Sequence, residues 1–254
     1  MKRLFICIKY IFKKKVERNN IWSVNSYIKD VKTLKDLIRT YNIDGDFVEL
    51  DKVIEKLNNS VYVDYNIKDL AFWIRGGLKD TKPKEENFNF IIIQCDNQVA
   101  VMNPMESDSD PLYIYSLNIK LTLKKSKLNE IGKRQSSWHL DKEKEPEKCH
   151  VTHPYYHFQF GGKKLEYLEE EMGLLSSPRI PHPPMDILLL FHFIINNYYP
   201  NNKFEELKKI LSDPDYIRII NNSKRRIWDH YFNSFKNNKN RHYTLERVFP
   251  LYTM

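Results

Sequence analysis

Histidine is the residue type that carries most of the possible chemistry in this chain, and it is concentrated in one segment. Five of the eight histidines fall between residues 138 and 183, namely His139, His150, His153, His157 and His182. Imidazole titrates near neutral pH, ligates metal ions and shuttles protons. We therefore expect a functional site, if the chain has one, in this segment.

Strand alternation would gather several of these groups on one surface. In the run 136–141, His139 and Asp141 share one face of an extended chain, and in 153–160 the residues His153, Tyr155, His157 and Gln159 do the same. If the two segments pair, four groups converge, and these are our candidate catalytic residues: His139, Asp141, His153 and His157.

Three of those histidines, His139, His153 and His157, are also candidate metal ligands, with Cys149 or His150 as additional ones. Such a set suits zinc or another divalent ion, and an open coordination position would activate water for hydrolysis. The alternative is that this face is a hydrogen-bonded polar surface of a tyrosine-rich sheet.

Two short motifs give other interpretations. His150-Val-Thr152 and His242-Tyr-Thr244 are paired H-x-T triplets. This pattern resembles that of the two-histidine phosphoesterases, which implies one histidine as base and the other as acid on an RNA phosphate. Arg225 and His230 form R-x(4)-H in a helical context, which resembles the motif of the toxin-like HEPN ribonucleases.

Composition argues against nucleotide-binding loops. The chain has only seven glycines, and it contains neither G-x-G-x-x-G nor G-x-x-x-x-G-K-[ST]. A dinucleotide fold or a P-loop is therefore not expected. Three widely spaced cysteines without a C-x-x-C pair favour a reducing compartment, and we expect a cytoplasmic protein.

The positive charge is concentrated at the start of the chain. Residues 1–20 carry seven basic residues against one acidic residue, or +6, so the other 234 residues contribute only +2 of the net +8. Lys13, Lys14, Lys15 and Arg18 are therefore expected to be exposed, and residues 1–18 are expected to make weak contacts with nucleic acid or an anionic membrane surface. The alternative is that the apolar residues 4–12 complete the core. The apolar run within them is short and interrupted by Lys9, so we expect neither a signal peptide nor a transmembrane segment.

Periodicity predicts an α+β fold, with N-terminal helices, a central antiparallel β-meander and a C-terminal helical segment. The 3.6-residue pattern predicts helices over 26–41, 47–58 and 184–198, with a further helix after Pro214. A sheet is expected over roughly 88–160, and Asp96–Asn97 is expected to be a turn between strands 88–94 and 98–102. Asp186 is expected near the start of the apolar helix.

The linker-like run 79–87 suggests two parts, a mainly helical region over 1–78 and a sheet with C-terminal helices over 88–254, unless both form a single domain. Two functions remain open. The first is an interaction protein whose histidine-rich sheet face and basic N-terminus engage a protein or nucleic-acid partner. The alternative is a hydrolase, metal-assisted or of the two-histidine phosphodiesterase or nuclease type, that uses the 139–157 cluster.

Overall fold

The structure is a computed structural model that describes residues 22–75, 90–102, 110–124, 134–145, 149, 153–161, 179–199, 205–233 and 244–248. The N-terminal basic segment, the linker-like run 79–87, His150 and His242 lie outside these residues, as do the predictions that concern them.

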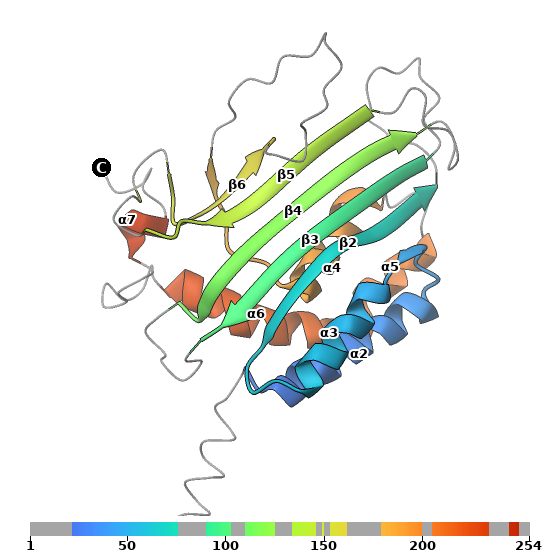
Figure 1. The fold of residues 1–254 in the computed structure, drawn as a ribbon. Coiled ribbons are helices and arrows are strands. Elements are labelled where there is room, and N and C mark those ends of the chain that lie inside the picture. Colours follow the sequence, from blue (N-terminus) through green and yellow to red (C-terminus); the bar gives the residue numbers. More distant parts are fainter. Residues whose placement is uncertain are drawn as a thin grey trace, which may run out of the picture.

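An antiparallel sheet forms the centre of the described structure, with its strands in chain order (Figure 1). Within the described residues it has seven strands: β1 (Gly45–Asp46), β2 (Asp64–Arg75), β3 (Phe90–Val101), β4 (Leu112–Lys124), β5 (Arg134–Lys142), β6 (Tyr156–Phe160) and β7 (Ile180–Pro181). The predicted antiparallel meander is confirmed. It begins earlier and ends later than the expected range 88–160, because β1, β2 and β7 also pair into it.

Helices precede and follow the sheet in sequence. They are α2 (Val24–Thr40), α3 (Val48–Asn58), α4 (Ile187–Tyr198), α5 (Glu205–Leu211), α6 (Pro214–Asn233) and α7 (Leu245–Val248). The α+β class is thereby confirmed. None of the helices in the described ranges combines the length and apolar character that crossing a bilayer requires.

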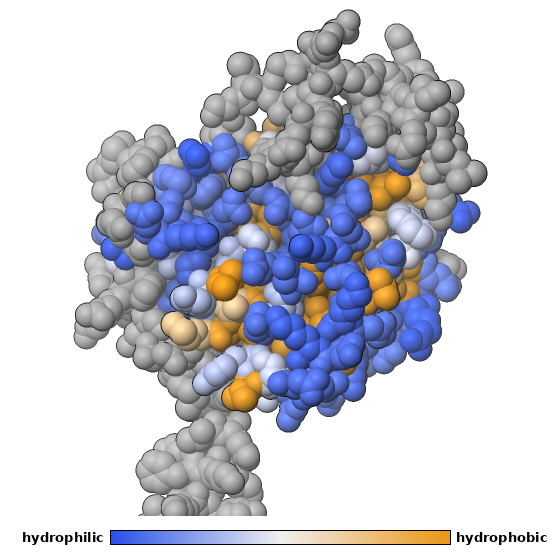
Figure 2. All heavy atoms as spheres, in the orientation of Figure 1, coloured by the Kyte–Doolittle hydropathy of each residue, from blue (hydrophilic) through white to orange (hydrophobic). Residues whose placement is uncertain are grey.

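The two faces of the sheet differ in polarity. Along β3, Ile91, Ile93 and Cys95 are fully buried, whereas the alternate residues Gln94 and Asp96 are only partly buried. Helices α4 and α6 lie behind the sheet in the view of Figure 1. The side of the sheet away from α4 is the open face, and Figure 2 shows mostly hydrophilic residues among those coloured in that view.

Strand β3 runs through the position where a turn was expected. The turn prediction at Asp96–Asn97 is wrong, because tertiary hydrogen bonds satisfy the buried Asn97 side chain within the strand. Its amide nitrogen donates to the carbonyls of Ser116 and Met185, both at 3.3 Å, and its oxygen accepts from the Tyr65 hydroxyl at 2.8 Å. None of these partners is local in sequence, so the turn propensity of the dipeptide is overridden.

Helix α4 starts at a buried carboxylate, as expected. Asp186 is the N-cap, and its Oδ1 accepts from the backbone N–H groups of Leu188 and Leu189 at 3.1 and 3.0 Å. The Ser223 hydroxyl on α6 donates to the same oxygen at 2.6 Å. The start of α4 is thus fixed to α6.

A buried ion pair joins the N-terminal and C-terminal helices. Asp30 on α2 and Arg226 on α6 are each 1% exposed and are in direct contact. Arg218 Nη1 donates to the other Asp30 oxygen at 3.1 Å, and the Asn222 amide adds a further hydrogen bond. The charges of two helices distant in sequence are therefore paired inside the core.

Candidate metal centre

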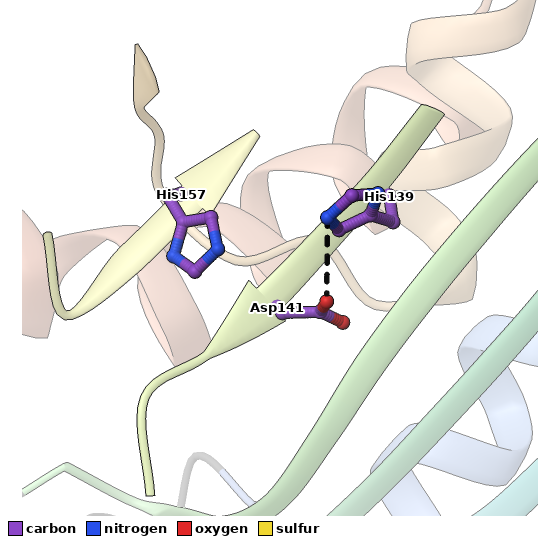
Figure 3. A group of neighbouring side chains, drawn as sticks. All are labelled: His139, Asp141 and His157. Atoms are coloured by element: carbon purple, nitrogen blue, oxygen red, sulfur yellow. Dashed lines mark ion pairs between the residues drawn. The ribbon is translucent and has the colours of Figure 1, made fainter. Parts of the chain in front are cut away.

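Register between β5 and β6 brings the candidate residues together. Asp141 pairs with His157, and His139 pairs with Gln159. Directly opposed residues of antiparallel strands have Cβ atoms roughly 5 Å apart, and alternation puts His139 and Asp141 on the same face. His139, Asp141 and His157 therefore project together from the open face, away from α4 (Figure 3).

These three residues, which we call the triad, are close enough to share an ion. One ligand atom from each lies within 4.8 Å of the others. His139 Nε2 is 3.6 Å from Asp141 Oδ2, and the ring centroids of His139 and His157 are 6.3 Å apart. Two imidazoles and one carboxylate can bind a divalent transition metal and leave positions open for water or substrate.

Backbone carbonyls select the tautomer of both histidines. His139 Nδ1 lies 3.3 Å from the Gly161 oxygen, and His157 Nδ1 lies 3.2 Å from the Pro154 oxygen. A carbonyl oxygen can only accept, so each Nδ1 carries the proton in these bonds. The Nε2 lone pair of each ring is left for a metal, in the arrangement that outer hydrogen bonds impose on histidine ligands.

The titration of the triad also suits metal binding. His157 is 4% exposed, and this burial lowers its pKa to about 4, so the ring is neutral at pH 7. Loss of solvent raises the pKa of Asp141, although 44% of its side chain is exposed, while the neighbouring His139 opposes that rise. A bound divalent cation would counteract this rise in the Asp141 pKa and hold the carboxylate ionised.

His153, the third histidine predicted as a ligand, stands beside the triad. Its ring meets that of His157 edge-to-face, with centroids 4.8 Å apart. Its Nε2 lies 3.0 Å from Glu143 Oε2, and the two side chains are 27% and 14% exposed. The structure therefore places His153 next to His157 of the triad and gives it an acidic neighbour, Glu143.

Sequence reasoning missed Glu143. Residues 139, 141 and 143 fall on the same face of an extended chain, so alternation could have predicted that Glu143 lies on the face of His139 and Asp141. Strand β5 itself ends at Lys142. A backbone hydrogen bond from Glu143 N to the Tyr155 oxygen, 2.8 Å long, continues the pairing beyond the strand. This bond is what brings Glu143 level with His153.

Tyr155 does not join the histidines, although alternation predicted that it shares their face. Strand β6 begins only at Tyr156, and both tyrosine hydroxyls donate to Asp110 Oδ2, at 3.1 and 2.8 Å. Lys142 Nζ binds the same oxygen at 2.8 Å. Tyr155 therefore belongs to a separate charged cluster.

The remaining candidates lie elsewhere. His182 packs on the Phe158 ring, 5.5 Å between centroids, and Phe158 in turn contacts Phe193 of α4. His182 is thus on the helix side of the sheet, away from the triad. Cys149 is partly buried against the core.

The structure describes the whole R-x(4)-H motif but only Thr244 of the two H-x-T triplets. Neither histidine of the two H-x-T triplets falls within the described residues. On α6, Arg225 is exposed and its guanidinium donates to Asn222, while His230 is partly buried.

Searches for relatives gave no match, whether against protein-family models, curated proteins or solved structures.

Proposed function

We propose that this chain is a metal-dependent hydrolase in which His139, Asp141 and His157 hold a divalent transition metal such as zinc. The observation that carries the proposal is the convergence of three ligand atoms within 4.8 Å of one another, with both imidazoles held in the tautomer that offers Nε2. Three protein ligands with further positions open is the usual plan of catalytic zinc sites.

The proposed reaction is hydrolysis of an ester, with phosphate esters as the first class to test. A bound divalent ion would act as a Lewis acid and lower the pKa of water toward neutrality. The water oxygen attacks the phosphorus of the ester, and its proton passes to a nearby base. The phosphorus–oxygen bond to the leaving group breaks, and the leaving-group oxygen receives the proton that the water gave to the base.

His153 is the proposed base. Its Nε2 lies 3.0 Å from Glu143 Oε2, and this carboxylate would stabilise the imidazolium that forms when the ring accepts a proton. Its ring touches His157, so it lies next to a metal ligand without being one of the triad. The same imidazolium returns the proton to the leaving group.

The test begins with metal binding by the full chain. Protein stripped with a chelator is titrated with Zn²⁺, Mn²⁺ and Co²⁺ in competition with a chromophoric chelator. We expect one tight site that is lost in His139→Ala/His157→Ala. The matched control is His192→Gln, because His192 lies on α4, where its ring bonds the Tyr216 hydroxyl at 2.7 Å.

Activity is then measured on bis(4-nitrophenyl) phosphate with metal-free and metal-loaded protein. Hydrolysis that needs the metal and disappears in the double variant is the expected result. Metal binding without hydrolysis of phosphate or carboxylate esters would contradict the enzyme proposal.

That second outcome would favour the other candidate, an interaction protein. Large apolar side chains are exposed at one end of the sheet, including Val61 at 82%, Tyr113 at 63% and Met102 at 54%. Such residues are typical of contact surfaces when they occur together. In this alternative the histidine-rich face and the basic residues 1–18 engage a protein or nucleic acid, and the triad holds an ion for structure alone.

A further inference from the structure

The polar surface of the triad continues onto the neighbouring strand. On β4, Asn118 pairs with His139, Ser116 with Asp141, and Lys120 with Ser137. Paired residues on one face are neighbours, so the side chain of Asn118 lies next to that of His139 at the edge of the triad. A ligand bound at the triad could therefore also contact the polar side chains of β4 on the same face of the sheet.

A hollow lies on this open face one strand further on. It has a volume of about 60 Å³ and is lined by Asp69, Gln94, Asp96, Asn118 and Lys120, from β2, β3 and β4. A water molecule occupies about 30 Å³ in the liquid, so the hollow admits one or two hydroxyl groups of a larger ligand. The ligand itself would lie across the sheet.

The lining chemistry matches hydroxyl groups. Carboxylates only accept hydrogen bonds, an ammonium only donates, and carboxamides do both. A hydroxyl both donates and accepts, so a set of two carboxylates, two carboxamides and one ammonium can satisfy several hydroxyls at once. A purely anionic or purely apolar ligand would leave part of this set unmatched.

The side chains that line the hollow are also preorganised, because they bond to one another. Asp69 has a left-handed backbone, with φ of 55°, at a bulge where the pairing of β2 with β3 shifts between Ile67 and Leu70. Its N–H donates to Asp96 Oδ1 at 3.0 Å, and Gln94 Nε2 donates to Asp69 Oδ1 at 3.4 Å. Groups already held in place lose little entropy when a ligand binds.

We propose that the hollow and the triad together bind a hydroxyl-rich molecule that carries an anionic oxygen group at one end, that is, a sugar phosphate or a sugar acid. The proposal rests on the metal site proposed above, which would take the anionic group. Adjacent strands are about 4.8 Å apart, so the hollow lies roughly 10 Å from the triad, a span that one sugar unit with its charged group can cover.

The test compares matched ligands on zinc-loaded protein by calorimetry. Ribose 5-phosphate should bind at least about tenfold more tightly than inorganic phosphate, or gluconate at least about tenfold more tightly than acetate. The ligand pair that shows this roughly tenfold difference in affinity identifies the anionic group as a phosphate or a carboxylate. Equal affinity within both pairs would overturn the proposal.

A double variant tests whether the hollow is the source of the extra affinity for the hydroxyl-rich ligand. Gln94→Ala/Asn118→Ala should abolish the extra affinity for the hydroxyl-rich ligand and leave zinc binding and the affinity for phosphate unchanged. Asn66→Ala, an exposed position on the same strand as Asp69, is the control and should behave as wild type. A gain that survives the double variant would place the sugar elsewhere and overturn the proposal.

One measurement separates failure of the hollow from failure of the metal site. Ribose 5-phosphate and gluconate are each added in excess to metal-free protein while the side-chain amide resonances of Gln94 and Asn118 are recorded. If zinc does not bind, the proposed function fails, and these two resonances still report on the hollow. Resonances that stay unchanged with both ligands would reject the hollow itself.

Discussion

Asp141 and His157 face each other across β5 and β6, one at the end of a strand and the other near the start of the next. The pairing brings a carboxylate next to an imidazole that is almost fully buried and neutral at pH 7. This combination is unusual for a solvent-facing side of a sheet, where paired side chains are mostly hydrated. An unprotonated imidazole nitrogen next to a carboxylate is the combination of donors that the proposed metal site requires.

Replacing His157 by Gln should weaken zinc binding by more than the 10- to 100-fold that loss of an outer hydrogen-bond partner causes, because a direct ligand is removed. The measurement is competition with a chromophoric chelator at pH 7. His182→Gln is the matched control, since that ring lies on the helix side of the sheet. Equal losses in both variants would point to general misfolding.

His153→Gln and Glu143→Gln should separate the roles of base and ligand. If His153 is a proton acceptor, kcat should fall by about 10²- to 10⁴-fold, and zinc affinity should change little. The pH profile of kcat should lose its lower limb in His153→Gln, and in Glu143→Gln that limb should shift to lower pH because the imidazolium loses its carboxylate partner. A large fall in zinc affinity in His153→Gln would show that His153 is a ligand, as the sequence alone suggested.

Stability should depend on pH through His157. Burial lowers its pKa from 6.5 to about 4, so below pH 6.5 the unfolded chain binds more protons than the folded one. The stability that the neutral ring provides is thus complete above pH 6.5 and is lost as the pH falls toward 4. The separation of the two pKa values sets the loss at about 3 kcal/mol at most.

Urea unfolding of the metal-free protein at pH 7 and pH 5 measures this effect. Burial also lowers the pKa values of His182 and His192, which contribute in the same direction. The informative quantity is therefore the difference between wild type and His157→Gln. If both lose the same free energy of unfolding between the two pH values, His157 is not responsible.

The buried pair between α2 and α6 should dominate the polar contribution to stability. Asp30→Ala leaves Arg226 charged inside the core and should lower the free energy of unfolding by about 3–5 kcal/mol. Asp51→Ala is the control, because its partner Lys35 is on the surface and such pairs contribute about 1 kcal/mol or less. Similar losses in both variants would mean that Arg226 is rehydrated.

The sequence predicted what depends on local periodicity. Alternation at His139, Asp141 and His157 predicted their common face, because a period of two fixes the side of a strand, and the sheet expected over 88–160 contains β3 to β6. Tertiary contacts decided the rest. Asn97 stays inside a strand because Tyr65 and Met185 satisfy it, and Glu143 reaches His153 through pairing beyond the end of β5.

The triad forms only when β5 and β6 pair in the observed register, so metal binding would report on that register. Because side chains alternate, a slip of one residue would set Tyr156 or Phe158 opposite Asp141 and turn His157 toward the core. Only the correct register assembles three ligands, so an ion that binds there selects that register by mass action. Zinc added during refolding should therefore act as a proofreader of strand alignment and favour chains in which the five-residue strand β6 has joined in the correct register.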